Sequence, residues 1–352
     1  MSTIPTMEGI ESRIVDTDRL TVHVLLAGPD DGTPVLFVHG NGSSATFWEE
    51  TMLALPYGYR GIAPDMRGYG DTEQRPVDAT LGLGDMVEDV RALVRALGLA
   101  KHHIVGHSMG GGIVMKYALE DADDLLSITL VDTMSPYGYS GSKGPDGEPC
   151  YDDGAPAGAA GVNPDFIRLM KEKDRGTDNP SSPLNVLRQF YVKPPYACAR
   201  EEELLSSMLS LRVGEDWYPG DFVPSPHWPG AAPGKKGIVN AFSRLYFDAS
   251  GLADIEPRPP ILWIRGDDDL IVANNAMWDI AALGAMGFVP GYPGLDECPP
   301  QPMLTQVRAV LDRYQANGGT YREVVINDAG HSPYLEKPEE FNREFHRFLR
   351  AA

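Results

Sequence analysis

His103-Ile104-Val105-Gly106-His107-Ser108-Met109-Gly110 is the stretch of this sequence that decides the fold. A short β-branched strand, residues 103–105, leads into a turn, and a helical pattern follows at 109–119. Glycines on both sides of Ser108 permit a strained strand-to-helix turn that pushes the serine Oγ out over the edge of a sheet. The motif alone is weak evidence in a chain with 38 glycines, but its place between a strand and a helix is specific. We therefore predict that Ser108 is a nucleophile.

Strand and helix patterns alternate on both sides of this turn. Apolar runs predict strands at 20–27, 35–38, 61–63, 103–105, 128–131, 261–264 and 321–326. Amphipathic patterns predict helices at 45–55, 85–97, 109–119 and 338–349. This alternation predicts an α/β core with a doubly wound, mostly parallel sheet that is covered by helices on both faces.

The alternation stops after Asp132. From 135 to 250 the chain is dense in glycine and proline, with short helical stretches at 164–173 and 199–211 and no strand periodicity. We predict that residues 1–134 and 251–352 form the core and that 135–250 form an inserted, mainly helical and loop-rich cap. A second irregular insertion, residues 285–302, is expected to form another wall near the site.

Composition limits the classes of partner and compartment. The chain has 352 residues, with 30 basic and 50 acidic side chains and a net charge of −20, which disfavours nucleic acid and anionic membranes. Cys150, Cys198 and Cys298 lie far apart without paired spacing, so we expect free thiols and a reducing compartment. No apolar run approaches 18 residues, and residues 1–19 lack an apolar leader segment, so a cytoplasmic location is expected. The sequence leaves the oligomeric state open.

A serine at neutral pH needs a base, and the base needs an orienting carboxylate. Asp267, Asp268 and Asp269 follow the strand 261–264, and His331 follows the strand 321–326. The chain order is therefore serine, aspartate, histidine. The aspartate run could suggest a metal site, but no histidine or cysteine accompanies it at ligand spacing, so neither a metal nor a cofactor is expected.

Taken together, these motifs resemble the α/β-hydrolase family, over the chain outside the cap. The resemblance covers the loops His39-Gly40-Asn41-Gly42, Asp65-Met66-Arg67-Gly68-Tyr69-Gly70, Gly330-His331-Ser332-Pro333 and Glu336-Lys337-Pro338. It implies an oxyanion hole made by the backbone N–H groups of Asn41 and Met109. The family's spacing selects Asp269 as the acid, but some members carry the acid after the preceding strand of the sheet, where Asp132 stands as the alternative.

The other histidines near these motifs are expected to have supporting roles. His39 is expected to buttress the oxyanion loop, and His107 to pack inside the turn. Cap aromatics would line the pocket over Ser108, and the first choices, in a proline-broken context, are Trp217, Tyr218, Phe222 and Trp228.

The predicted function is a serine hydrolase that cleaves a small-molecule carboxylic ester or lactone through an acyl-enzyme. Relatives with an aspartate nucleophile are excluded by Ser108, since a serine cannot replace their alkyl-ester step. The long cap suggests a bulky substrate, and the chain is similar to bacterial serine esterases that open macrolide lactones, an antibiotic-resistance activity. Carbon–carbon bond hydrolases of the same fold, and receptors that retain the triad but only bind a small molecule, remain alternatives.

Overall fold

The computed structural model describes residues 2–352, and within them the core is an eight-stranded sheet. Its strands are Glu11–Asp16 (β1), Thr21–Ala27 (β2), Thr33–Val38 (β3), Tyr59–Pro64 (β4), His102–His107 (β5), Leu125–Val131 (β6), Ile261–Gly266 (β11) and Tyr321–Ile326 (β12). The order across the sheet is β1-β2-β4-β3-β5-β6-β11-β12. β2 is antiparallel to β1 and β4, and every other neighbouring pair is parallel. The predicted mostly parallel sheet is confirmed.

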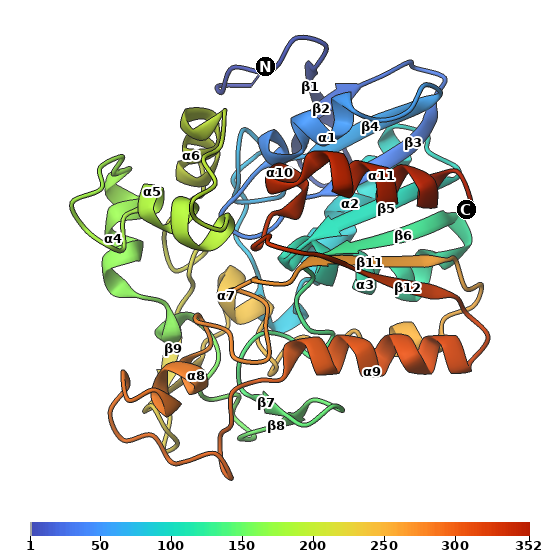
Figure 1. Cartoon of the computed structure of the whole chain (residues 1–352). Coiled ribbons are helices and arrows are strands. Elements are labelled where there is room, and N and C mark those ends of the chain that lie inside the picture. The colour runs from blue at the N-terminus through green and yellow to red at the C-terminus, as the bar shows by residue number, and fades with distance from the viewer. Residues whose placement is uncertain (1) are drawn as a thin grey trace.

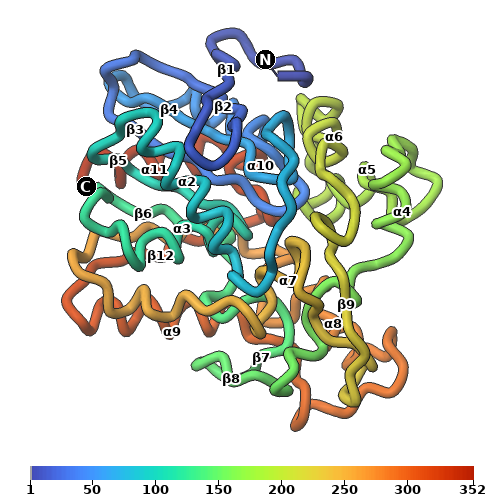
Figure 2. Tube along the Cα trace, turned by 180° about the vertical axis from the view of Figure 1, so that it is seen from behind, coloured from blue at the N-terminus to red at the C-terminus, as the bar shows by residue number. Residues whose placement is uncertain are grey.

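Helices cover both faces of this sheet. The flanking helices are Glu49–Leu53 (α1), Gly84–Ala96 (α2), Met109–Asp121 (α3), Met303–Ala316 (α9), Pro333–Glu336 (α10) and Pro338–Leu349 (α11). Figures 1 and 2, which are opposite views, show α10 and α11 on one face and α2 and α3 on the other. All six residues of β5 are buried, as expected for a central strand that has helices on both sides. Strand β1 and helix α9 were not predicted from the sequence.

The cap segment, residues 135–250, lies off one end of the sheet rather than over either face (Figures 1 and 2). Its helical elements are Pro164–Glu172 (α4), Pro183–Val186 (α5), the π-helical turn Leu187–Tyr191 (η5), Glu201–Leu209 (α6) and Ile238–Ala241 (α7). It also contains two small hairpins, formed by Ser142–Lys143 (β7) with Glu148–Pro149 (β8) and by Phe222–Pro224 (β9) with Ala231–Pro233 (β10). The sequence shows no strand periodicity in this segment because strands of two or three residues are too short to produce a period.

The second insertion packs against the cap. It follows helix Ile280–Ala285 (α8), and Figures 1 and 2 place α8 beside β9. Trp228 Nε1 donates a hydrogen bond to Pro290 O at 2.9 Å, and the Tyr151 hydroxyl donates to Glu297 at 2.7 Å. Cys150 in the cap packs against the small buried cluster that contains Cys298 of the insertion. None of the helices in the described part of the chain combines the length and apolar character needed to cross a bilayer.

Candidate active site

Ser108 occupies a sharp turn at the carboxyl end of β5. Its backbone has φ 55° and ψ −119°, a conformation that side-chain-bearing residues rarely adopt, and helix α3 begins at the next residue. A Cβ on Gly106 would lie 2.4 Å from the carbonyl oxygen of Gly110, and one on Gly110 would lie 2.3 Å from the carbonyl oxygen of Val38. Both glycines are therefore required by close backbone contacts, which is the steric reason for the motif.

His331 and Asp269 meet at the same edge of the sheet, since they follow the neighbouring parallel strands β12 and β11. His331 Nδ1 donates to Asp269 Oδ2 at 2.8 Å. Asp269 Oδ1 accepts backbone hydrogen bonds from Ile271 at 2.7 Å and Val272 at 3.0 Å, which fix its orientation. Because Nδ1 carries the proton toward the aspartate, Nε2 of His331 is left as the potential base.

His107 connects the serine turn to the histidine loop. Its Nε2 donates to the carbonyl oxygen of His331 at 2.7 Å, and the ring centroids of His107 and His331 lie 4.6 Å apart. Burial, followed by the charge of His331, lowers the pKa of His107 well below its ordinary value, so the ring is neutral and donates one hydrogen bond. The hydrogen bonds found within residues 2–352 include none between Ser108 Oγ and His331, and such catalytic bonds commonly form only in the substrate complex.

The loop after β3 passes directly beside the serine. A Cβ on Gly40 would lie 3.0 Å from the Ser108 Cβ. His39 supports this loop as expected, because its Nδ1 bonds the carbonyl of Gly40 at 2.8 Å and its Nε2 accepts from the backbone N–H of Met66 at 3.0 Å. The backbone N–H groups of Asn41 and Met109 have no hydrogen-bond acceptor within residues 2–352. Unpaired donors of this kind are available for an anion.

Two tyrosines bond Asn41, one to its side chain and one to its backbone, and the sequence did not indicate this role for either. The Tyr69 hydroxyl donates to Asn41 Oδ1 at 2.7 Å, and the Tyr191 hydroxyl donates to the backbone carbonyl of Asn41 at 2.5 Å. Tyr191 also packs edge-on against the His331 ring, with ring centroids 6.0 Å apart. Tyr69 stands in a loop that resembles a family motif, whereas Tyr191 comes from the cap turn η5, where the sequence shows it only as one of many cap aromatics.

Glu336 joins the histidine loop to the cap. One carboxylate oxygen accepts from the backbone N–H of Gly330 at 2.9 Å, and the other accepts from that of Lys193 at 2.8 Å. Burial raises the pKa of Glu336. The Lys193 side chain is also paired with Asp268 and with Asp328 at 2.7 Å, so the cap is fastened beside both loops that carry the candidate base and acid.

Asp132, the alternative acid, lies at the end of β6 and is 1% exposed. Its Oδ1 accepts from the backbone N–H of Gly266 at 3.0 Å. Within residues 2–352, the only carboxylate hydrogen-bonded to His331 is that of Asp269. The geometry therefore favours Asp269 as the partner of the histidine.

The four cap aromatics proposed from the sequence occupy different surroundings. Tyr218 is buried and lies edge-on to Phe166 of α4, with ring centroids 6.3 Å apart. Trp217 lies against Gly68, 3.5 Å from the position of a Cβ there. Phe222 is 62% exposed on β9, and Trp228 packs on Tyr292 with ring centroids 5.4 Å apart. The structure brings neither Phe222 nor Trp228 into contact with Ser108.

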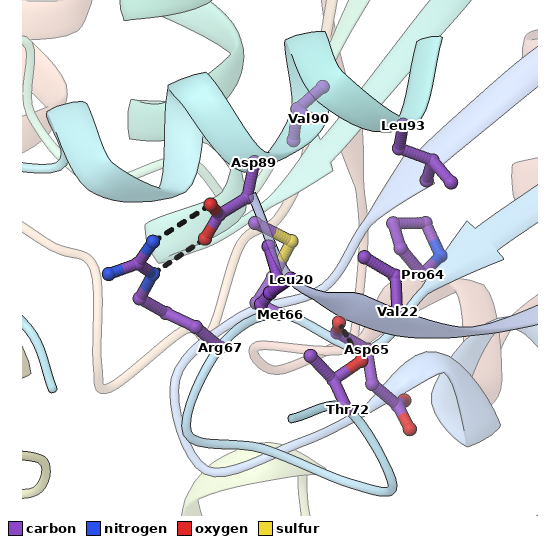
Figure 3. A pocket seen from close by; sticks show the side chains of 10 residues that line it. All are labelled: Leu20, Val22, Pro64, Asp65, Met66, Arg67, Thr72, Asp89, Val90 and Leu93. Atoms are coloured by element: carbon purple, nitrogen blue, oxygen red, sulfur yellow. Dashed lines mark hydrogen bonds and ion pairs between the residues drawn. The ribbon is translucent and has the colours of Figure 1, made fainter. Parts of the chain in front are cut away.

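Two cavities were found away from the catalytic side chains. One, of about 10 Å³, lies beneath the ion pair of Arg67 with Asp89 and has room for one water at most (Figure 3). The other, of about 220 Å³, lies on the surface between the N-terminal segment and α6 and is lined in part by Lys173 and Arg175. Neither is lined by Ser108.

Comparison with known proteins gives the family. The α/β-hydrolase fold profile matches residues 33–143. A non-heme chloroperoxidase from Streptomyces lividans is 31% identical over 290 residues, which cover 81% of this chain and 91% of that protein.

Two further comparisons agree with this result. A fluoroacetate dehalogenase from a Burkholderia species is 32% identical over 133 residues, which cover 37% of this chain and only 43% of that protein. The solved carboxylesterase CesB from Bacillus subtilis matches 97% of this chain and 92% of its own with a TM-score of 0.60, at 15% identity, which supports the fold alone. From the strand order, the serine turn and these matches, we conclude that the chain belongs to the α/β-hydrolase fold family.

Proposed function

We propose that this hydrolase cleaves carboxylic esters or lactones through an acyl-enzyme on Ser108. The observation that carries the proposal is the strained serine at the end of β5, beside a hydrogen-bonded histidine–aspartate pair and two unpaired backbone N–H groups. A tetrahedral intermediate needs this set of groups: a nucleophile, a base with a fixed tautomer, and donors aimed at the developing oxyanion.

In the acylation step, Ser108 Oγ bonds to the carbonyl carbon while His331 Nε2 takes the serine proton. The carbonyl oxygen becomes negatively charged and is stabilised by the N–H groups of Asn41 and Met109. The intermediate then collapses, the bond to the alkoxide breaks, and His331 returns the proton to the departing oxygen. A water molecule, deprotonated by His331, repeats the sequence and releases the acid. Asp269 orients the imidazole and balances the charge of the imidazolium.

Ester chemistry is favoured over halide displacement because of the nucleophile. Attack by a serine on an alkyl halide would leave an ether, which hydrolysis does not release, whereas attack on an ester leaves an ester that water can cleave. Halide displacement, the reaction of the dehalogenase relative, is therefore not expected of this protein, and halogenation, named for the chloroperoxidase relative, is tested as a second control.

Because the cap is long, we propose that the substrate is an ester or lactone with a bulky acyl or alcohol group. Trp217 packs on Gly68, next to the Tyr69 whose hydroxyl bonds Asn41, so Trp217 and its neighbour Tyr218 are the cap aromatics that we would test for contact with a substrate. Macrolide lactones are one bulky class to include among the substrates tested.

The experiment is a panel of nitrophenyl esters, lactones, macrolides and amides, followed by mass spectrometry of the products, with halide release and halogenation as control assays. Hydrolysis of esters or lactones and covalent labelling of Ser108 by a fluorophosphonate are expected. Labelling at another residue, or ester turnover retained in Ser108→Ala, would exclude the proposed mechanism.

A further inference from the structure

Asp132 is held more tightly than a strand-end residue requires. Its backbone takes a left-handed φ of 40°, and its N–H donates to the carbonyl of Ile264 on β11 at 3.0 Å. Its Oδ1 accepts from Gly266 on the same strand, so the side chain is turned toward the loop that carries Asp269. Aspartate adopts positive φ more readily than most side-chain-bearing residues, and the two hydrogen bonds to β11 hold Asp132 in this conformation.

The second carboxyl oxygen of Asp132 is the unexplained atom. Oδ2 is buried and has no hydrogen-bond partner among the described residues. A buried charged oxygen without a donor is strongly unfavourable, whereas a protonated oxygen needs only an acceptor. The nearest candidate acceptor is Asp269, because one oxygen each of Asp132 and Asp269 and a ring nitrogen of His331 lie within 4.8 Å of one another.

The charges around the two carboxyl groups decide which of them holds a proton. Asp269 accepts three hydrogen bonds, from Ile271, Val272 and His331, whereas Asp132 accepts one. The remaining titratable neighbours are Glu336 and Tyr334 of α10, neither of which supplies a positive charge. Within residues 2–352, no lysine or arginine forms an ion pair with either carboxyl group. Two carboxylates this close to each other, with no cation between them, repel one another, and this repulsion together with burial favours the neutral acid at Asp132, which receives fewer hydrogen bonds.

We propose that Asp132 is a neutral carboxylic acid at neutral pH, whose Oδ2–H donates a hydrogen bond to Asp269. It is a positioning residue rather than the alternative acid. The hydrogen bond fixes the Asp269 carboxylate and shares its charge, which keeps Oδ2 of Asp269 directed at His331. Burial, followed by the charge of Asp269, raises the pKa of Asp132 well above its ordinary value, in agreement with this assignment. The catalytic consequence rests on the proposed ester hydrolysis.

The test compares two substitutions at Asp132 with one at Asp269. In Asp132→Asn, the amide carbonyl can still accept from Gly266 and the NH₂ group can still donate to Asp269, so catalytic efficiency should stay within about threefold of the wild type. Asp132→Ala removes the donor and should lower it roughly ten- to hundredfold. Asp269→Asn should lower it by about 10⁴. If Asp132→Asn falls as far as Asp269→Asn, or if Asp132→Ala matches the wild type, the proposal is wrong.

The pH profile separates positioning from mere structure. If Asp132 is neutral, the acidic limb of the catalytic-efficiency profile, which reports His331, should not move in Asp132→Asn. If Asp132 were ionised, removing that negative charge would destabilise the imidazolium and move the limb to lower pH. Dialysis against a chelator is the control for a bound cation between the two carboxyl groups, and a loss of activity that added metal restores would also overturn the proposal.

A second readout does not depend on turnover. Infrared difference spectroscopy of wild type against Asp132→Asn at neutral pH should show a protonated-carboxyl C=O band that only the wild type has. A carboxylate band in its place would contradict a neutral Asp132. If no ester is cleaved by the wild type, the proposed function fails while this measurement still decides the protonation state.

Discussion

Replacing Asp132 with Asn should make the protein more stable at neutral pH, although the site contains the candidate catalytic groups. Burial, followed by the charge of Asp269, raises the pKa of Asp132 in the folded state well above its ordinary value. Below about pH 4 both the folded and the unfolded chain hold this proton, and the group does not affect stability. Above that pH the unfolded chain releases the proton while the folded chain retains it. The free energy of unfolding of the wild type therefore falls by up to about 1.4 kcal/mol for each pH unit.

Asn cannot titrate, so the variant avoids this loss. The free energy of unfolding of Asp132→Asn minus that of the wild type should be lowest near pH 4 and should rise with pH until the folded-state pKa is passed. Urea unfolding followed by circular dichroism from about pH 4 to pH 8 measures this difference, and the low-pH end serves as the internal reference. The other buried acids are the same in both proteins and cancel. A difference that stays flat or falls as pH rises would refute a protonated Asp132.

Three further outcomes follow from the site. Ser108→Ala should reduce ester turnover by about 10⁶ without unfolding the protein, as measured by single-turnover kinetics and circular dichroism. Tyr191→Phe removes the hydroxyl that donates to the Asn41 carbonyl and should lower kcat roughly tenfold with little change in KM, since the oxyanion loop acts mainly in the transition state. Tyr218→Ala should lower catalytic efficiency on a bulky ester by roughly ten- to hundredfold and leave that on a small acetate unchanged. The control Phe222→Ala, on an exposed strand, should change neither. Equal losses on both substrates in Tyr218→Ala would assign Tyr218 to the core of the cap.

The core could be predicted because its signals are local. A buried strand shows as an apolar run, and the serine turn shows as two glycines whose missing Cβ atoms admit backbone oxygens at 2.4 Å and 2.3 Å. Parallel strands end at one edge, so the strand pattern predicted that Ser108, an aspartate and His331 would lie at that edge, and the family resemblance selected Asp269 as the aspartate. Strand β1 was missed because it is an edge strand with much of its surface exposed, where no continuous apolar run develops.

The support around the site could not be predicted because it is not local. Tyr191 lies 150 residues from Asn41 in the chain, and its hydroxyl reaches that carbonyl only because a π-helical turn of the cap folds back over the sheet edge. Phe222 and Trp228 share the proline-broken context of Tyr218, yet one lies exposed on a hairpin and the other packs on the second insertion. Composition indicated an aromatic cap, but the direction of each ring depends on contacts between distant segments.

The two candidate acids show where chain order stops being informative. Asp132 and Asp269 follow adjacent strands, so both arrive at the same edge of the sheet and both can approach His331. What separates them is the number of donors each receives: the loop after β11 turns two backbone N–H groups onto Asp269, whereas β11 itself gives one to Asp132. Hydrogen bonds to the charged form favour ionisation, and burial without them favours the neutral acid. The turn at 269–272, rather than the aspartate itself, therefore makes Asp269 the hydrogen-bond partner of the histidine.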